Sequence, residues 1–418
     1  MNTADMQPEF VKFNCGGCQT ELKVPRSSVS SAGVQCPRCQ NVNNVPLTPK
    51  PLSAVAAEIK PVESSPEVVP VVQPSEANEQ SDGNESILPV TPQHQGSDTA
   101  IKLLYHRITD EVGKVFVGQD ELVLGTLVAL FSGGHVLIES APGLGKTLFV
   151  RTLGKVLGCK FGRIQFTADL MPSDLTGAPI FNMKTQEFDF RPGPVFTQLL
   201  LADEINRAPA KTHAALLEIM QESTVTIDGT THELQPPFLC LATQNPIESE
   251  GTYNLPEAQL DRFMFKLVAE YPGEREEAQI LALHGGQVDL GKRLQDEISV
   301  ISSPEEISKV IQENGQVRVD PLLVDYINKM VRLTREWPQF YMGASPRAGI
   351  ALMQGARTLA AFCGRDYAVP DDVVTIAVPT LRHRVMLTAE AEVEGQSVDR
   401  LLHDLIRTIE VPRIKSQG

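Results

Sequence analysis

The chain has no long hydrophobic run and too few positive charges to balance its acids. Across 418 residues, 37 lysines and arginines face 52 aspartates and glutamates, which gives a formal net charge of −15. This balance argues against a protein that mainly binds duplex DNA or an anionic membrane. No apolar stretch approaches the ~20 residues needed to cross a bilayer, and the first residues lack the basic-then-apolar order of a secretory signal. We therefore expect a cytoplasmic protein without membrane insertion.

Cysteine is also scarce, and four of the seven cysteines occur as two close pairs. Cys15 and Cys18 form one C-x-x-C pair, and Cys36 and Cys39 form the other after seventeen intervening residues. In a reducing compartment such pairs point to metal or redox chemistry rather than to disulfides. Two such turns can present four thiolates to one tetrahedral Zn²⁺ ion, which is the spacing of a structural zinc site.

The first hundred residues are predicted to hold a small module and a tether. Residues 10–45 resemble a zinc ribbon, whose folding energy the metal would supply; iron in the same shell, a redox pair or two disulfides are the alternatives. Residues 46–98 contain nine prolines, eight acids, two lysines and no aromatic residue. Such a segment cannot bury a core, so we expect a disordered linker. It could let the ribbon search for a partner, or it could be a plain spacer.

From residue 136 a short apolar strand, a glycine-bearing turn and a helix follow one another. This is the context of a phosphate-binding loop, in which backbone N–H groups at a helix N-terminus converge on phosphate oxygens. Lys146 can reach the β- and γ-phosphates of ATP, and the Thr147 hydroxyl can ligate Mg²⁺. The predicted nucleotide-binding residues are Ser140, Ala141, Pro142, Gly143, Leu144, Gly145, Lys146 and Thr147.

This loop departs from the pattern G-x-x-x-x-G-K-[ST] at its first position, where Ser140 stands in place of glycine. A bend over residues 140–142 could replace the glycine, which leaves the geometry of the loop open. The alternative is an ordinary strand-to-helix turn that contains a lysine. Two further motifs make that alternative the weaker one.

Two more apolar runs end in polar side chains. Residues 198–202 lead to Asp203 and Glu204, and residues 238–244 lead to Asn245. Apolar runs of this kind are typical of central parallel strands that are covered on both faces. We predict that Asp203 holds the Mg²⁺ ion and that Glu204 polarises the water that attacks the γ-phosphate. Asn245 is placed to hydrogen-bond the γ-phosphate or that water.

Five motifs, APGLGKT, LLLADEINRAP, ATQNP, LPEAQLDRF and GASPRA, occur in the order and spacing of the AAA+ ATPases. The set resembles the MoxR family of the helix-2-insert clade and covers about residues 99–411. MoxR proteins often carry alanine where Gly145 stands, so the chain differs from them there. The resemblance implies an α/β P-loop core with a five-stranded parallel sheet over residues 99–272. It also implies an all-helical lid domain over residues 273–412.

The resemblance implies roles for single residues as well. Asn245 corresponds to sensor 1, Arg262 resembles an arginine finger that reaches the neighbouring subunit's nucleotide, and Arg347 resembles sensor 2 on the lid. These roles make chemical sense because a guanidinium stabilises the negative charge that spreads as the γ-phosphate leaves. Arg207 is a candidate for a second arginine at the subunit interface.

These features predict an ATPase that uses ATP, Mg²⁺ and a structural Zn²⁺ ion. By resemblance it would hydrolyse ATP between the subunits of a homo-oligomeric ring, a hexamer, and remodel or mature a protein client that can carry a von Willebrand factor A domain. One alternative is a ribbon-guided nucleic-acid motor or transcription-related ATPase, against which the acidic balance weighs. The other is a nucleotide-gated scaffold with little turnover, against which the intact Glu204, Asn245 and Arg262 weigh.

Overall fold

The computed structural model describes residues 10–14, 21–25, 34–35, 38–39, 42–43, 96–184, 186–245, 253, 255–285 and 290–412. The chain divides into two compact units, residues 1–82 and residues 83–418. Among the helices of the described residues, none combines the length and the apolar character needed to cross a membrane.

The first unit contains two short antiparallel strand pairs. Strands β1 (Phe10–Asn14) and β2 (Glu21–Pro25) pair, as do β3 (Val34–Gln35) and β4 (Val42–Asn43). Each pair of strands brackets one C-x-x-C pair of the sequence. Cys15, Cys18 and Cys36 and linker residues 46–95 lie outside the described residues, so the zinc site and the disordered linker stay predictions.

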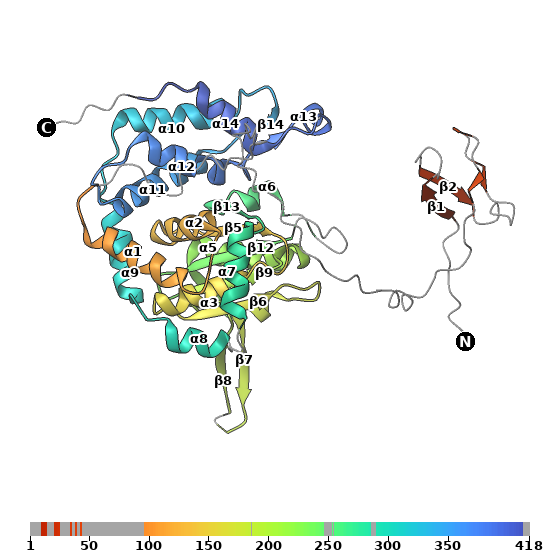
Figure 1. Ribbon diagram of the computed structural model, residues 1–418. Helices are drawn as coiled ribbons and strands as arrows, with labels where there is room; N and C mark the ends of the chain where they lie inside the picture. The colour runs from red at the N-terminus through yellow and green to blue at the C-terminus, as the bar shows by residue number, and fades with distance from the viewer. Residues whose placement is uncertain are drawn as a thin grey trace, which may run out of the picture. The chain divides into compact units, whose positions relative to one another are not determined.

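The second unit is built on a five-stranded parallel sheet, as predicted (Figure 1). Its strands stand in the order β13-β5-β12-β9-β6, and neighbours are parallel throughout. Their bounds are β5 (Val136–Ser140), β6 (Phe161–Gln165), β9 (Leu199–Asp203), β12 (Leu239–Gln244) and β13 (Phe265–Ala269). Because all strands run the same way, the loops that follow them gather at one edge of the sheet, which is where α/β folds bind ligands.

Both faces of the sheet are covered by helices. Successive side chains of a strand point to opposite faces, so the central strands contribute side chains to two separate hydrophobic clusters. In β9, Leu199 and Leu201 enter a cluster with helices α1 (Ala100–Gly113), α2 (Asp120–Phe131) and α3 (Lys146–Val156), whereas Leu200 enters a second cluster with α5 (Ala210–Glu222). This double coverage explains why the strands read as continuous apolar runs rather than as alternating ones.

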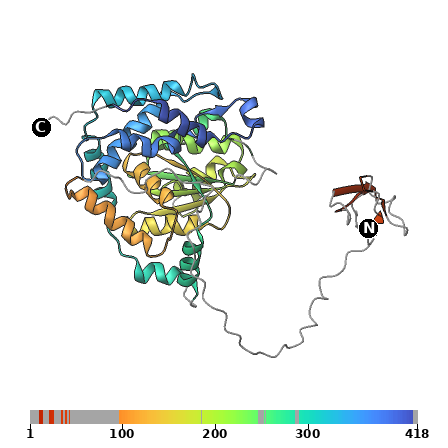
Figure 2. The ribbon, with the colours of Figure 1, turned by 45° about the horizontal axis from the view of Figure 1, so that its top comes forward.

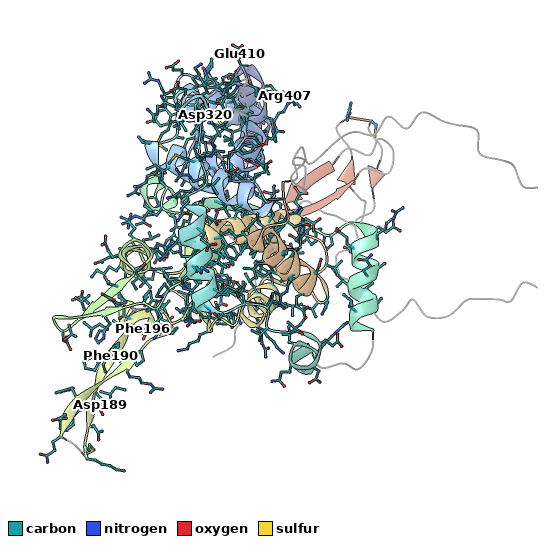
Figure 3. All side chains as sticks on the ribbon, turned by 90° about the vertical axis from the view of Figure 1, so that its left-hand side faces the viewer. Asp189, Phe190, Phe196, Asp320, Arg407 and Glu410 are labelled. Carbon is teal, nitrogen blue, oxygen red and sulfur yellow. The ribbon has the colours of Figure 1, made fainter. Side chains whose placement is uncertain are left out.

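Two hairpins leave this core. Strands β7 (Gly177–Asn182) and β8 (Glu187–Pro192) form one hairpin, and β10 (Thr224–Ile227) pairs with β11 (Thr230–Glu233) to form the other. Figures 1 and 3 show β7–β8 projecting from the body, with Asp189 and Phe190 along it and Phe196 at its base. The ring of Phe190 stacks on His232 of β11 at a centroid distance of 4.3 Å, so the two hairpins are in contact. Short elements of the same unit are α4 (Pro172–Thr176), a 3-10 turn at Ile205–Arg207 and α6 (Glu257–Leu260).

The lid, which runs from teal and cyan at α9 and α10 to blue at the later helices in Figures 1 and 2, packs against the core. It comprises α9 (Pro304–Asn314), α10 (Pro321–Leu333), α11 (Pro346–Phe362), α12 (Pro370–Leu381), α13 (Ala389–Val393) and α14 (Val398–Thr408). The expectation of an all-helical lid needs one correction, because β14 (Phe340–Met342) pairs with β15 (Met386–Leu387). Core and lid share one hydrophobic cluster, in which Phe362 of α11 stacks on Tyr105 of α1 at 4.4 Å.

Helices α7 (Glu274–His284) and α8 (Leu290–Glu297) follow the last core strand. Lys155 of α3 donates to the carbonyl oxygen of Gln295 at 2.6 Å, and the Ile301 N–H donates to the Val156 carbonyl at 2.7 Å. Residues around α8 therefore bond to the core rather than to the lid. The domain limits at 45, 98, 272 and 412 stay predictions.

Candidate nucleotide-binding site

The predicted phosphate loop connects β5 to α3 and contains two glycines in the left-handed region. Gly143 has a φ of 86° and Gly145 a φ of 76°, a conformation that costs side-chain-bearing residues free energy. A Cβ atom added at Gly143 would meet nothing within 4 Å. The backbone angle at Gly143, and not crowding around it, is therefore what favours glycine there. The turn delivers the first N–H groups of α3, an eleven-residue helix, to the end of β5.

Ser140 occupies the place of the missing first glycine, and its side chain has a defined contact. It is the last residue of β5 and is 3% exposed. Lys146 Nζ donates to Ser140 Oγ at 2.6 Å and to the carbonyl oxygen of Ala141 at 3.3 Å. The hydroxyl therefore holds the lysine beside its own loop, a contact that a glycine could not make.

Asp203 and Glu204 lie where β9 ends, and Thr243 of β12 connects them. Thr243 Oγ1 donates to Asp203 Oδ1 at 2.6 Å and accepts from the Glu204 N–H at 2.9 Å. Asp203 is 8% exposed, and Glu204 has a φ of 56°, in the left-handed region. The strand register brings Thr243 beside the carboxylates, because Ala242 pairs with Ala202. Thr243 was not among the predicted site residues, although it stands in the ATQNP motif.

Side chains from β6 surround the two carboxylates. Arg163 Nη2 lies 2.7 Å from Asp203 Oδ2, and Gln165 Nε2 donates to Glu204 Oε2 at 2.8 Å. Arg207, the candidate interface arginine, pairs through Nε with Glu204 Oε2 of its own chain at 3.0 Å. Sequence reasoning missed Arg163 and Gln165 because nothing in the sequence of β6 shows that this strand lies next to β9.

Lys146 interacts electrostatically with the two carboxylates at the end of β9. Burial lowers the pKa of Lys146 and outweighs Asp203 and Glu204, which act in the opposite direction. At the same edge, Lys266 Nζ lies 2.6 Å from Glu139 Oε2, and Gln244 donates to that oxygen at 2.9 Å. Burial would raise the pKa of Glu139, but these two partners outweigh it and the net shift is downward. Acidic side chains of β5 and β9 are thus paired with, or close to, the lysines of β13 and α3.

Asn245 is brought to this edge by strand register. Gln244 pairs with Glu139 of β5, so Asn245, the next residue, reaches the level of Ser140. It is 8% exposed. Asn245 therefore lies between the ends of β5 and β9, close to the phosphate loop and the strand-end carboxylates.

The two predicted functional arginines lie elsewhere. Phe265, the first residue of β13, pairs with Val136, the first residue of β5. Arg262 comes just before β13 in the chain, so it stands at the amino-terminal edge of the sheet, where these strands begin. Strands advance about 3.3 Å per residue, which places roughly 13 Å of sheet between this edge and Ser140. Arg262 Nη1 donates to the Leu217 carbonyl at 3.1 Å. Arg347 is exposed in the first turn of α11.

The donor set at the carboxyl edge fits a nucleotide and its metal. A lysine amine and the N–H groups at the start of α3 suit phosphate oxygens, and hydroxyl and carboxylate oxygens are the ligands that Mg²⁺ prefers. Glycine loop, strand-end carboxylates and helical lid together define a P-loop ATPase of the AAA class. In agreement, residues 135–265 match the family described as "ATPase family associated with various cellular activities (AAA)", and residues 332–405 match the AAA lid domain.

Similarity to proteins that match most of the chain narrows the class. The chain is 44% identical over 309 residues to the Bacillus subtilis protein YeaC, which is uncharacterized, covering 74% of this chain and 95% of that one. It is 43% identical over 315 residues to the Mycobacterium tuberculosis protein named chaperone MoxR1, covering 73% and 82%. It is 29% identical over 330 residues to the MoxR protein of Methylorubrum extorquens, covering 73% and 94%. The chain therefore belongs to the MoxR family of AAA ATPases.

A solved structure supports the same conclusion. The crystal structure of a candidate ATPase from Cytophaga hutchinsonii is similar with a TM-score of 0.70 at 40% identity. The similarity covers 75% of this chain and 96% of that one. The chain is thus an AAA ATPase, for which ATP is the substrate and Mg²⁺ the cofactor.

Proposed function

We propose that this ATPase works as a homo-oligomeric ring, a hexamer, that hydrolyses ATP at its subunit interfaces to remodel or mature a protein client. The observation that carries the hydrolytic part is the convergence of Lys146, Asp203 and Glu204 at one sheet edge, with Thr243 linking the two acids. Arg262 supports the ring, since it stands at the opposite edge of the sheet and so faces away from its own phosphate loop.

Each residue then has a role. Lys146 and the loop from Ser140 to Gly145 bind the phosphates, and Thr147 and Asp203 hold the metal. Glu204 takes the proton of the attacking water, and Asn245 orients that water or the γ-phosphate. Bound Mg²⁺ supplies neutralisation of phosphate charge. Arg207, which is bonded to Glu204 of its own chain, is the candidate for a second arginine at the interface.

A protein client is supported by the exposed apolar side chains on the β7–β8 hairpin. Phe181 is 50% exposed, Phe188 is 70% exposed and Met183 is 86% exposed. Apolar side chains that gather on a projecting element mark contacts with other proteins. The similar protein of Mycobacterium tuberculosis bears the name chaperone, and a client with a von Willebrand factor A domain is the partner that the family resemblance implies. The zinc ribbon, on its acidic tether, would recruit that client.

The catalytic assignment is tested by two substitutions. Lys146→Ala should abolish ATP binding because it removes the cation that faces the phosphates, whereas Glu204→Gln should keep binding and lose turnover. Isothermal titration with ATP and a phosphate-release assay measure the two properties on the same preparations. Parent-like phosphate release by the Glu204→Gln protein would remove Glu204 from the mechanism.

A further inference from the structure

The carboxylate of Asp261 joins the loop before β13 to two elements of the lid. Arg384, which follows α12, lies with Nε 2.8 Å from Asp261 Oδ1. Ser345, the N-cap residue of α11, donates from Oγ to Asp261 Oδ2 at 2.8 Å. Both oxygens of one core carboxylate are therefore bonded by lid side chains.

Arg384 is fixed to the same loop by further bonds. It is 5% exposed, and its guanidinium donates to the carbonyl oxygens of Phe263 at 2.6 Å and Met264 at 3.0 Å. The neighbouring His383 has Nε2 at 3.0 Å from the Phe263 carbonyl, which can only accept. A buried, satisfied cation costs much free energy to pull from its partners, so this part of the lid and the loop move as one body.

The two predicted functional arginines adjoin this carboxylate. Arg262 is the next residue in the chain. The Arg347 N–H donates at 3.1 Å to Ser345 Oγ, the same hydroxyl that donates to Asp261. Arg262 stands at the edge of the sheet opposite its own phosphate loop, and the start of α11 with Arg347 is bonded through Ser345 to the carboxylate beside it.

We propose that Asp261 is a positioning residue that holds Arg262 and the start of the Arg347 helix as one unit, presented to the nucleotide of the adjacent subunit. A displacement of the lid then reaches Arg262 through Ser345 and Arg384, so the state of one subunit alters catalysis in its neighbour. This inference rests on the proposed function, because it assumes that Arg262 acts across the interface.

Mixed assemblies test the role in trans. Arg262→Ala subunits, which keep Glu204, are mixed with Glu204→Gln subunits, which keep Arg262, under conditions where subunit exchange is demonstrated. Turnover above both components shows an arginine acting across the interface. The Glu204→Gln partner is then replaced by a Glu204→Gln/Asp261→Asn partner, whose own site is already inactive. We expect about tenfold less turnover at saturating ATP, since a finger in trans contributes roughly 10³ to 10⁵ in rate.

A second variant guards against misfolding around the buried Arg384. In the Glu204→Gln partner, Ser345→Ala removes the bond to Asp261 together with the helix cap, and Ser345→Thr restores the hydroxyl. The matched control is Ser303→Ala, which removes the serine cap of α9 far from Asp261. We expect loss with Ser345→Ala, rescue with Ser345→Thr and no change with Ser303→Ala.

The outcomes separate the two proposals. If the Glu204→Gln protein does not restore any turnover to the Arg262→Ala protein, Arg262 does not act across the interface. That result would reject both the trans role of Arg262 and the positioning role of Asp261. If it complements, but the partners with Asp261→Asn or Ser345→Ala do so equally well, Asp261 has no positioning role while the proposed function stands. A loss with Ser345→Ala that Ser303→Ala reproduces equally would reduce the effect to helix capping, and would also overturn the proposal.

Discussion

At the scale of single residues, Thr243 connects the two acids of the predicted site, Asp203 and Glu204. Thr243 bonds the Asp203 carboxylate with its proton and the Glu204 N–H with its lone pair. Since Glu204 has a left-handed backbone conformation, which is unfavourable for a residue with a side chain, the bond to its N–H helps to hold it there. A hydroxyl can play both parts at once, which a methyl group cannot.

We therefore predict that Thr243→Val lowers kcat more than it changes ATP affinity. The substitution keeps the volume but leaves a carboxylate oxygen and an N–H without their partner, at a cost of about 1–3 kcal/mol. If that cost falls on the active arrangement, kcat falls by about tenfold to a hundredfold. Steady-state hydrolysis and ATP titration check this, with Thr243→Ser as the control that keeps the hydroxyl. Equal kcat values for the valine variant and the parent would contradict it.

The sequence motifs predicted which polar residues lie at the end of the sheet, but they did not predict which side chains bond to those residues. Lys146, Asp203, Glu204 and Asn245 stand out because each follows an apolar strand, and parallel strands end at one edge. The contacts of Ser140 with Lys146 and of Arg163 with Asp203 depend on side-chain conformation and on which strands are neighbours. Those are tertiary facts that no local pattern carries.

At the scale of elements, the sequence marks where several lid helices begin. Helices α10, α11 and α12 start at Pro321, Pro346 and Pro370, because proline suits the first helical position. Asp320 accepts from the Leu322 N–H at 2.8 Å as a helix cap. The short β14–β15 pair was missed because its strands are two and three residues long and far apart in the sequence.

Helix α11 contains two glycines that should respond to alanine in opposite ways. At Gly355 an added Cβ would lie 2.4 Å from Ile376 Cδ1 of α12 and 3.3 Å from Phe265 of the core sheet, within packed surroundings. Gly355→Ala should therefore destabilise the protein by about 1–3 kcal/mol through overpacking.

The matched control in the same helix is Gly349→Ala, where the nearest atom would be Ile327 Cγ2 at 3.7 Å, an ordinary contact. Here the gain in helix propensity should stabilise the protein by about 0.5–1 kcal/mol. Thermal and urea unfolding followed by circular dichroism measure both. A Gly355→Ala protein as stable as Gly349→Ala would show that α11 and α12 do not meet as closely as the structure has them.

At the scale of the whole molecule, two residues just before α1 are bonded to the segment that follows α11. The Gly96 N–H donates to the Cys363 carbonyl at 2.6 Å, and Ser97 Oγ donates to the Gly364 carbonyl at 3.3 Å. A truncation that spares the ATPase should therefore keep these two residues. Because residues 10–43 belong to a separate compact unit, the zinc module and the ATPase should be separable.

Removal of residues 1–95 should eliminate bound zinc and leave basal ATP hydrolysis largely unchanged. The truncation keeps Gly96 and Ser97, and with them the bonds to the lid, while it takes away Cys15, Cys18, Cys36 and Cys39. The full-length protein should bind one Zn²⁺ per chain, since four thiolates complete a closed tetrahedral shell. Elemental analysis measures the zinc content and a phosphate-release assay measures ATP hydrolysis, both on the truncated and the full-length protein. The Cys36→Ser variant of the full chain is the control that removes a single zinc ligand. Zinc retained by the truncated protein would place the metal elsewhere, and a collapse of its hydrolysis would mean that the first unit supports the ring itself.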